Sequence, residues 1–553
     1  IVSSNTALTS FTCHGNLLTN LNVANNTLLT VLNCSQNQLT SLDLTNNTSL
    51  FNLSCSNNQL SSIDLSTLIN LQSLNCSNNI LTFLDCSTNI HLTSLAFFFF
   101  FSLQTLLLKN GSDESLQTHS TFWIENWLPL NSPNLQYVCV DDFQMSNILQ
   151  NVAPNVVVNT YCSFTQGGNY NTINGTATFD ANSNGCDTSD ALIPNIKFNL
   201  TDGTNEGATF TNTSGNYKFY TDAGNFVITP NIENPTFFNF SPASATINFA
   251  DNNNNITTQN FCLSPNGVHR DLEVILAPIT PARPGFDATY KLVYKNKGNQ
   301  TQSGTVNLVF NDDKTDFVSS DPIVDNLAIN SLIWNYSNLL PFESRSIYIV
   351  LNVNSPLETP AVNIGDVLNF VATINPISGD ELPDDNTFAL AQTVVGSYDP
   401  NDITCLEGNN VAPSEIGEYL HYVINFENTG NYPAENVVVK TIVDTAKFDV
   451  NSLQLLNTSN PVDARITGNV VEFIFENINL PFAAGTNNGY VSFKIKTKPT
   501  LLVGDSFSNL VNIYFDYNYP IVTNNFVSTI QNSLGQNSFE VNKFLAYPNP
   551  VKN

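Results

Sequence analysis

The segment from Asp180 to Asp190 has the residue types of a calcium-binding loop. It reads Asp-Ala-Asn-Ser-Asn-Gly-Cys-Asp-Thr-Ser-Asp, and side-chain oxygens recur at Asp180, Asn182, Asn184, Asp187 and Asp190. Hard cations such as Ca²⁺ take oxygen ligands from alternate residues of a loop in which a glycine permits a sharp turn. The segment therefore predicts a calcium site. The alternative is an Asn- and Asp-rich β-turn that holds no metal.

Two other groups of oxygens are weaker candidates for cation binding. The first lies near a predicted joint between domains and comprises Asp384, Asp385, Asn386, Asp399, Asn401 and Asp402. The second is a series of aspartates 21 residues apart, Asp43, Asp64 and Asp85. Stacked at the usual inter-strand spacing of about 4.8 Å, these carboxylates would repel one another unless a cation or a proton intervened. The simpler interpretations are a solvated linker and an open, hydrated face.

A repeat of 21 residues organises the N-terminal part of the chain. Cys13, Cys34, Cys55 and Cys76 recur at this period, within segments such as LTVLNCSQNQLTSLDL and LFNLSCSNNQLSSIDL. A fixed period of this length predicts a solenoid in which each repeat is one coil. Each coil is expected to have two short strands, L-x-x-L-x-C and L-x-x-L-D-L. An asparagine follows each cysteine by three residues (Asn16, Asn37, Asn58 and Asn79) and is predicted to hydrogen-bond the backbone of its own and neighbouring coils.

The pattern L-x-x-L-x-C-x-x-N-x-L resembles leucine-rich repeats in the short form common in surface proteins of Bacteroidetes-type bacteria, and it is similar to internalins. The resemblance implies a leucine-rich-repeat solenoid over residues 1–108, and the pattern breaks at Phe100. An open solenoid end exposes apolar surface. Residues 109–165 are therefore predicted to be a cap, with cover from Trp123, Trp127, Phe143 and Ile148.

The outward positions of the first strand in each coil form a polar, uncharged array. This predicted ligand-binding face comprises Ser10, Thr12, His14, Asn33, Ser35, Asn52, Ser54, Ser56, Ser73, Asn75 and Ser77. Hydroxyl and amide groups suit glycans or extended polar ligands. They also suit a repeat that only keeps itself soluble.

From residue 166 onward, short alternating strands separated by Gly, Asn and Pro turns predict β-sandwiches. Residues 166–265, with the FDANSNGCD loop and the SGNYKF turn, resemble collagen-adhesin B-type modules. Residues 266–395 and 396–530 read as two copies of one immunoglobulin-like sandwich, since YKLVYKNKGN matches YVINFENTGN. The fold class is therefore mainly β, a solenoid followed by tandem sandwiches that would act as a stalk.

Residues 531–553 are a polar linker followed by FLAYPNPVKN. Tyr547, Pro548, Asn549 and Pro550 resemble the start of the C-terminal sorting domain of the type IX secretion system. The resemblance implies a secreted or outer-surface protein exported by that machinery. Because the sequence begins at Ile1, a signal peptide is expected to have been removed, or the sequence is a fragment.

Secretion permits disulfides, and the chain has ten cysteines. Cys139–Cys162 and Cys186–Cys262 are the predicted pairs, which leaves Cys405 over. The solenoid cysteines are expected to be buried small hydrophobes.

Composition argues against several functions. The net charge is −28, with no basic footprint for nucleic acid or anionic membranes. The apolar stretch 92–108 is too short and too interrupted for a membrane span. The five histidines are scattered, and no conventional catalytic motif is present. The sequence thus predicts a non-catalytic adhesion or ligand-binding protein whose partner is an extracellular protein or glycan. The alternatives are a purely structural spacer and a polysaccharide-active enzyme.

Overall fold

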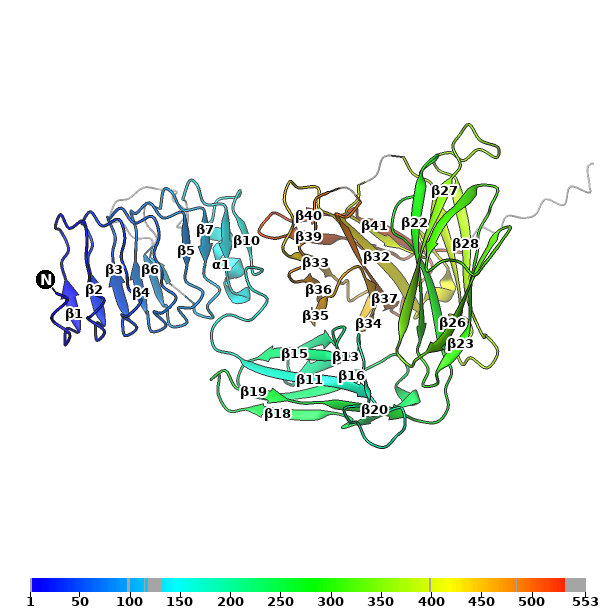
Figure 1. Cartoon of the computed structure of the whole chain (residues 1–553), viewed down its shortest axis with the longest axis horizontal. Coiled ribbons are helices and arrows are strands. Elements are labelled where there is room, and N and C mark those ends of the chain that lie inside the picture. The colour runs from blue at the N-terminus through cyan, green and yellow to red at the C-terminus, as the bar shows by residue number, and fades with distance from the viewer. Residues whose placement is uncertain are drawn as a thin grey trace, which may run out of the picture.

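Parallel three-residue strands, one per coil, form the first sheet of the N-terminal part. The computed structural model describes residues 2–96, 100–113, 115–117 (backbone only), 132–396, 399–483 and 485–532. Figure 1 shows a stack of coils, blue to cyan, at one end, and three β-sandwich regions grouped at the other. We call these parts the coil stack (residues 2–165) and the first (166–265), second (266–395) and third (396–530) sandwiches.

The first sheet of the coil stack keeps the 21-residue period throughout. Leu32 pairs with Leu53 and Leu53 with Leu74, and all three leucines are fully buried. In spatial order the strands are β1 (Ser10–Thr12), β2 (Val31–Asn33), β3 (Asn52–Ser54), β4 (Ser73–Asn75), β6 (Ser94–Ala96) and β8 (Ser115–Gln117).

The second predicted strand of each coil forms only in the later coils. The second sheet contains β10 (Val157–Asn159), β9 (Tyr137–Cys139), β7 (Thr105–Leu107) and β5 (Phe83–Asp85). Residues 39–44 and 60–65, predicted as strands, instead run through turns and irregular backbone. The reason is that asparagine side chains replace the backbone carbonyls to which a strand would bond. The N–H groups of Leu39 and Leu60 donate to the amide oxygens of Asn58 and Asn79, respectively.

The coils continue into residues 109–165, where the sequence predicts only a cap. Strands β8, β9 and β10 lie in this range and extend both sheets. The 3₁₀ turn η1 (Asp142–Gln144) and the helix α1 (Met145–Asn151) lie between β9 and β10. Ile148 packs on the leucine core as expected, whereas Phe143 is exposed. Trp123 and Trp127 lie outside the described residues, as do Phe97 to Phe99.

Two series of buried asparagines hold the coils together. Asn37, Asn58 and Asn79 each donate to the carbonyl of the cysteine in their own coil and of the cysteine one coil back. A second series was not predicted: Asn47 donates to the carbonyls of Val23 and Asn26, and Asn26 and Asn89 bond in the same way. Turn backbone that would otherwise be unpaired inside the stack is satisfied by these amides.

The first sandwich has an aromatic core between two sheets. Phe198 stacks on Tyr217 at 4.3 Å between ring centroids and lies 5.0 Å from Phe261. One sheet runs β12 (Ala191–Leu192), β11 (Asn171–Phe179), β20 (Phe261–Pro265) and β17 (Phe238–Ser241), with β15 (Asn216–Thr221) and β19 (Ile256–Thr258) also on β11. The other begins β18 (Ala245–Phe249), β16 (Gly224–Asn231), β13 (Lys197–Thr201) and β14 (Glu206–Phe210), and η2 spans Pro235–Phe237.

The second sandwich packs a four-stranded sheet on a five-stranded one. The four-stranded sheet is β21 (Leu272–Pro278), β22 (Asp287–Asn296), β27 (Ser344–Val353) and β24 (Thr315–Asp321). The five-stranded sheet is β25 (Asn326–Ala328), β26 (Ser331–Leu339), β23 (Gln302–Val309), β28 (Val367–Asn375) and β29 (Thr387–Thr393).

The third sandwich shares a sheet with the first. Strand β35 (Asp463–Thr467) pairs with β14, so β18-β16-β13-β14 continues into β35, β36 (Val470–Phe475), β33 (Val437–Ile442), β39 (Val511–Phe515) and β40 (Ile521–Val522). The remaining sheets are β30 (Asp402–Cys405), β32 (Tyr419–Glu427), β37 (Asn488–Thr497) and β34 (Phe448–Thr458), and β31 (Asn410–Val411), β41 (Phe526–Ile530) and β38 (Ser506–Asn509). The turn η3 is Pro413–Glu415.

These contacts differ from the predicted stalk of sandwiches in series. The third sandwich also reaches back to the coil stack, where the hydroxyl of Tyr161 donates to Glu472 at 2.6 Å and the Tyr137 and Tyr517 rings lie 4.7 Å apart. The chain therefore folds back on itself (Figure 1). The physical reason is that β14 and β35 are sheet edges whose backbone groups are satisfied by pairing with each other.

Candidate functional site

The predicted ligand-binding face forms two in-register rows on the first sheet of the coil stack. One row follows Ser10, Val31, Asn52, Ser73 and Ser94, and the other follows Thr12, Asn33, Ser54, Asn75 and Ala96. Ser10 and Thr12 are exposed at the end of the stack, and Asn33, Asn52, Ser54, Ser73 and Asn75 are half-buried by their neighbours. Apart from Val31 and Ala96, the side chains of these rows are uncharged donors and acceptors.

Three serines predicted for this face point inward instead. Ser35, Ser56 and Ser77 are buried. Ser35 shares a hydrogen bond of 2.7 Å with Ser54, and the hydroxyl of Ser77 donates to the carbonyl of Ala96 at 3.0 Å. Ser35 and Ser77 thus bond to a strand residue of the next coil, and burial makes all three serines unavailable to a ligand. His14, which follows a strand, is exposed.

The predicted calcium loop is closed by its own backbone hydrogen bonds. Buried Asp180 accepts the N–H groups of Asn184 and Gly185, and Asn182 also accepts from Asn184. Asp190 accepts from the N–H of Asp187 at 2.8 Å. Asp187 accepts from Ser189, which lowers the pKa of Asp187. Within the described residues, the three aspartates of this loop do not converge within 4.8 Å of one another.

The aspartate series at period 21 has a local structural role. Asp43, Asp64 and Asp85 each accept the N–H of the residue two positions later. Hydrogen bonds from Thr45 and from Ser66 lower the pKa values of Asp43 and Asp64. The carboxylates therefore stabilise the turns that follow them, with Asp43 and Asp64 exposed to water and Asp85 half-buried.

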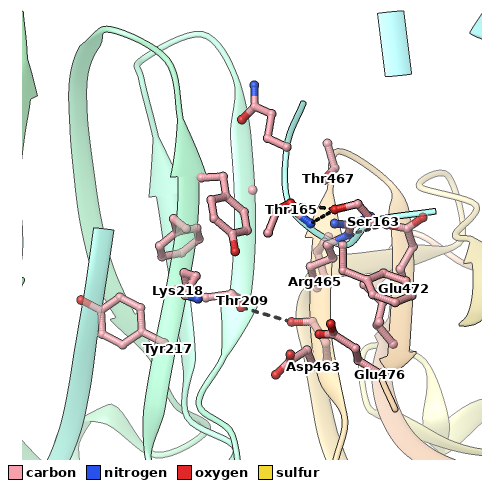
Figure 2. Close-up of a pocket in the computed structure, with 18 of the residues that line it drawn as sticks. Ser163, Thr165, Thr209, Tyr217, Lys218, Asp463, Arg465, Thr467, Glu472 and Glu476 are labelled. Carbon is pink, nitrogen blue, oxygen red and sulfur yellow. Dashed lines mark hydrogen bonds and ion pairs between the residues drawn. The ribbon is translucent and has the colours of Figure 1, made fainter. Parts of the chain in front are cut away.

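A cleft of about 1570 Å³ opens where the coil stack, the first sandwich and the third sandwich meet. In Figure 2, Lys218 and Tyr217 come from the first sandwich, and Asp463 and Arg465 from the third. Thr209 on β14 donates to the carbonyl of Ala464 at 3.3 Å, beside the strand pairing that joins the two walls. The lining charges are partly paired within one wall, since Arg465 donates to Glu472 at 2.6 Å. Burial raises the pKa of Asp463, and Lys218 offsets part of that rise.

A cluster of buried and half-buried charged side chains joins all three sandwiches. We call it the charge cluster: Glu233, Asp271, Glu273, Lys295, Lys297, Asp380, Asp385 and Lys494. The Lys297 ammonium lies 3.1 Å from Glu233 and 3.5 Å from Asp271, and it also contacts Asp385. Lys494 of β37 lies 2.8 Å from Glu233 and contacts Glu273. Removing one partner of such a buried pair costs about 3–5 kcal/mol of stability.

The lysines of the charge cluster cannot neutralise every carboxylate. Burial alone would raise the pKa of Glu273, but Lys494 and Lys297 hold that pKa well below its usual range. Burial and the neighbouring acids raise the pKa of Asp271 to about 6, and that of Asp385 to about 8, although Lys297 acts in the opposite direction. Asp271 and Asp385 are therefore the carboxyl groups of the cluster that most readily hold a proton.

The residues of the predicted joint between domains lie in two different sandwiches. Asp385 and Asn386 belong to the second sandwich and lie beside Asp271, whereas Asp384 is exposed. Asn401 and Asp402 are buried in the third sandwich, where Asn401 accepts the N–H of Glu427 and Asp402 accepts from Asn425. Sequence reasoning missed Glu233, Asp271, Glu273, Lys297, Asp380 and Lys494. A sequence signal existed for Glu273 and Lys494, which lie within strands that otherwise read as buried, whereas Glu233, Asp271, Lys297 and Asp380 lie outside strands.

The structure contains two disulfides, Cys139–Cys162 and Cys186–Cys262, which are the pairs expected from the sequence. Cys34, Cys55, Cys76 and Cys405 are buried free thiols whose pKa values burial raises. Among the described residues, no helix is long and apolar enough to span a bilayer. Tyr547 to Pro550 lie outside the described residues.

Comparisons with known proteins find similarity to parts of the chain. Residues 399–529 match a family model described as a domain of unknown function, DUF7619. No curated protein matches the chain. Solved structures of bacterial surface adhesins and pilins are similar to parts of it.

The functional domain of InlJ from Listeria monocytogenes, which includes a cysteine ladder, is 18% identical, with 48% of this chain and 63% of that chain covered and a TM-score of 0.17. The match thus spans less than two thirds of that domain. The major pilin SpaD of Corynebacterium diphtheriae is 9% identical over 63% of this chain and 87% of that chain, with a TM-score of 0.17. The collagen-binding domain of a Staphylococcus aureus adhesin is 15% identical over 25% of this chain and 100% of that chain, with a TM-score of 0.18. Similarities this low assign no ligand to this chain.

Proposed function

We propose that this chain is a non-catalytic, secreted or cell-surface adhesion protein that binds an extracellular protein or glycan through its coil stack. In this proposal the coil stack is a leucine-rich-repeat solenoid, and the immunoglobulin-like sandwiches form a folded base that holds it. The supporting observation is the pair of in-register polar rows on the first sheet, which follow Ser10, Asn52 and Ser73 and, beside them, Thr12, Asn33 and Asn75.

The chemistry of the rows favours an extended polar ligand. Their hydroxyl and amide groups can both donate and accept hydrogen bonds, and neighbouring coils repeat them at about 4.8 Å. An extended ligand can therefore make many weak contacts along the stack. Several copies displayed on one cell would increase the effective affinity without new contacts.

The proposal includes export by the type IX secretion machinery after removal of a signal peptide. Its support is the Tyr547-Pro548-Asn549-Pro550 motif, which follows a polar linker. The two disulfides are consistent with an oxidising compartment outside the cytosol.

The proposal can be tested by binding of the full chain to arrays of immobilised glycans and matrix proteins. The double variant N52R/S73R places bulky charges in one row, and its matched control N46R places a charge on an exposed turn outside both rows. We expect the double variant to lose binding and N46R to retain it. Equal binding by both variants would remove the coil face as the recognition surface.

Two other outcomes of the same experiment would replace the proposal. Absence of binding to every immobilised ligand would favour a structural spacer. Release of soluble products from the immobilised glycans would indicate a polysaccharide-active enzyme, and the carboxylates of the cleft, Asp463 and Glu476, would then be the first residues to substitute.

A further inference from the structure

We propose that Asp271, Asp380, Asp385 and Asn386 form a binding site for a divalent cation of the calcium type in the second sandwich. Asp271 directly precedes β21, and the other three residues lie between β28 and β29. One carboxylate oxygen from each of the three aspartates lies within 4.8 Å of the other two. Calcium binds oxygen at about 2.4 Å, so two oxygens on opposite sides of one ion are about 4.8 Å apart and a single ion can contact all three.

Buried oxygens without hydrogen-bond donors gather at this site. Asp271 and Asn386 are fully buried, and neither the Oδ1 of Asp271 nor the Oδ1 of Asn386 accepts a hydrogen bond. The Oδ1 of Asp385 is also buried and without a donor. Native proteins rarely leave buried acceptors unpaired, and each such group costs about 1–3 kcal/mol. The Lys297 ammonium lies 3.5 Å from the Oδ1 of Asp271 and contacts the other oxygen of Asp385, so the Oδ1 atoms of Asp385 and Asn386 are the acceptors that a further cation would satisfy.

The amide of Asn386 can supply a fourth ligand. Its Nδ2 donates to the Oδ2 of Asp380 at 3.2 Å, which places the amide group beside the carboxylates. The amide nitrogen and oxygen have nearly the same shape, so a half-turn of the group directs the oxygen to the same place. We infer that the amide donates to Asp380 without a cation and turns its oxygen inward when one binds.

The charge balance supports a divalent ion. The charge cluster contains five carboxylates (Glu233, Asp271, Glu273, Asp380 and Asp385) and three lysines (Lys295, Lys297 and Lys494). Lys297 contacts Asp385 and lies 3.1 Å from Glu233, 3.5 Å from Asp271 and 4.0 Å from Glu273, and Lys494 contacts Glu233 and Glu273. Three lysines against five carboxylates leave two negative charges, which one divalent ion balances.

The surrounding contacts give such an ion a structural effect. Asp380 accepts the N–H of Leu272 at 2.9 Å and that of Leu382 at 3.0 Å, so it already ties its loop to β21. A cation shared with Asp271 would fix this loop on β21 next to Glu233 of the first sandwich and Lys494 of the third. The ion would thus stabilise the junction of all three sandwiches. This inference is independent of the proposed adhesion function.

Calcium binding by the full chain tests the inference. After dialysis against chelator, titration calorimetry with CaCl₂ is expected to show binding, and calcium is expected to raise the melting temperature. D271N should bind calcium about tenfold more weakly or worse, because one charged ligand is lost. Because D271N also loses the ion pair with Lys297, its melting temperature in chelator is the reference, and the rise that calcium gives above it should be smaller than in the unmodified chain. A variant that only damaged the fold would melt lower in chelator and keep the full rise.

D384N is the matched control, because Asp384 is the exposed neighbour of Asp385 and belongs to neither group of converging carboxylates. It should behave like the unmodified chain in both measurements. D380N repeats the test should D271N fail to fold.

The inference is overturned if the unmodified chain binds no calcium, or if D271N and D380N retain its affinity. Calcium binding that is lost in D187N instead would locate the ion in the 180–190 loop and would also overturn it. An equal rise in melting temperature with magnesium would overturn the assignment to a calcium-type ion.

Discussion

Replacement of Asn58 by alanine should destabilise the coil stack by about 2–4 kcal/mol. The Oδ1 of Asn58 accepts the N–H of Leu39 at 3.0 Å, and its Nδ2 donates to the carbonyls of Cys34 at 3.1 Å and Cys55 at 3.0 Å. In N58A the buried N–H of Leu39 loses this acceptor, which costs about 1–3 kcal/mol. The carbonyls lose less, because each keeps a second amide donor from Asn37 or Asn79. Their weaker hydrogen bonding adds about 1 kcal/mol.

Hydrogen exchange measured by mass spectrometry in increasing urea gives a local readout of this effect. Peptides of the coil stack should exchange at lower urea in N58A, while peptides of the third sandwich should be unchanged. The control is N16A, because Asn16 occupies the same place in an exposed coil and donates only to the carbonyls of Cys13 and His14. We expect N16A to cost less than about 0.5 kcal/mol. Equal effects of N58A and N16A would refute the idea that buried amides hold the coils together.

Three further predictions concern the connections between parts of the chain. Burial lowers the pKa of Lys197 from 10.5 to about 8, so the unfolded chain binds more protons than the folded chain between these pH values. The free energy of unfolding of the unmodified chain, relative to that of K197M, should therefore increase by up to about 3 kcal/mol as pH rises from 8 to 10.5. A difference between the two chains that does not change with pH in urea unfolding would contradict this. Y161F removes a hydrogen bond to a buried carboxylate and should cost about 1.5–3 kcal/mol in thermal unfolding, whereas Y519F removes an exposed bond of 3.3 Å and should be nearly neutral. Replacing both cysteines of Cys186–Cys262, whose disulfide closes a loop of 76 residues, should lower the free energy of unfolding by about 4 kcal/mol. Replacing both cysteines of Cys139–Cys162, whose disulfide closes 23 residues, should lower it by about 3 kcal/mol. The reverse order in urea titrations would show that chain entropy does not set these contributions.

Local and periodic features of this protein could be predicted from its sequence. The 21-residue spacing of Cys34, Cys55 and Cys76 predicted coils that pair in register, and the asparagine three residues later predicted the amide bonds between coils. Alternation of apolar residues predicted the sandwiches. These features could be read because the interacting groups are near in sequence or repeat at a fixed interval, so pattern alone specifies the contact.

The tertiary structure alone decided which distant segments meet. The pairing of Gly207 with Thr467 joins two sandwiches in one sheet, and no local pattern distinguishes these edge strands from other edges. Ser35 resembles its neighbours on the predicted face, yet it is buried and hydrogen-bonds Ser54 of the next coil. The charge cluster combines Glu233, Asp271 and Lys494 from three sandwiches. A charged residue is ordinarily read as exposed, and only the packing of the three domains brings these charges together as partners.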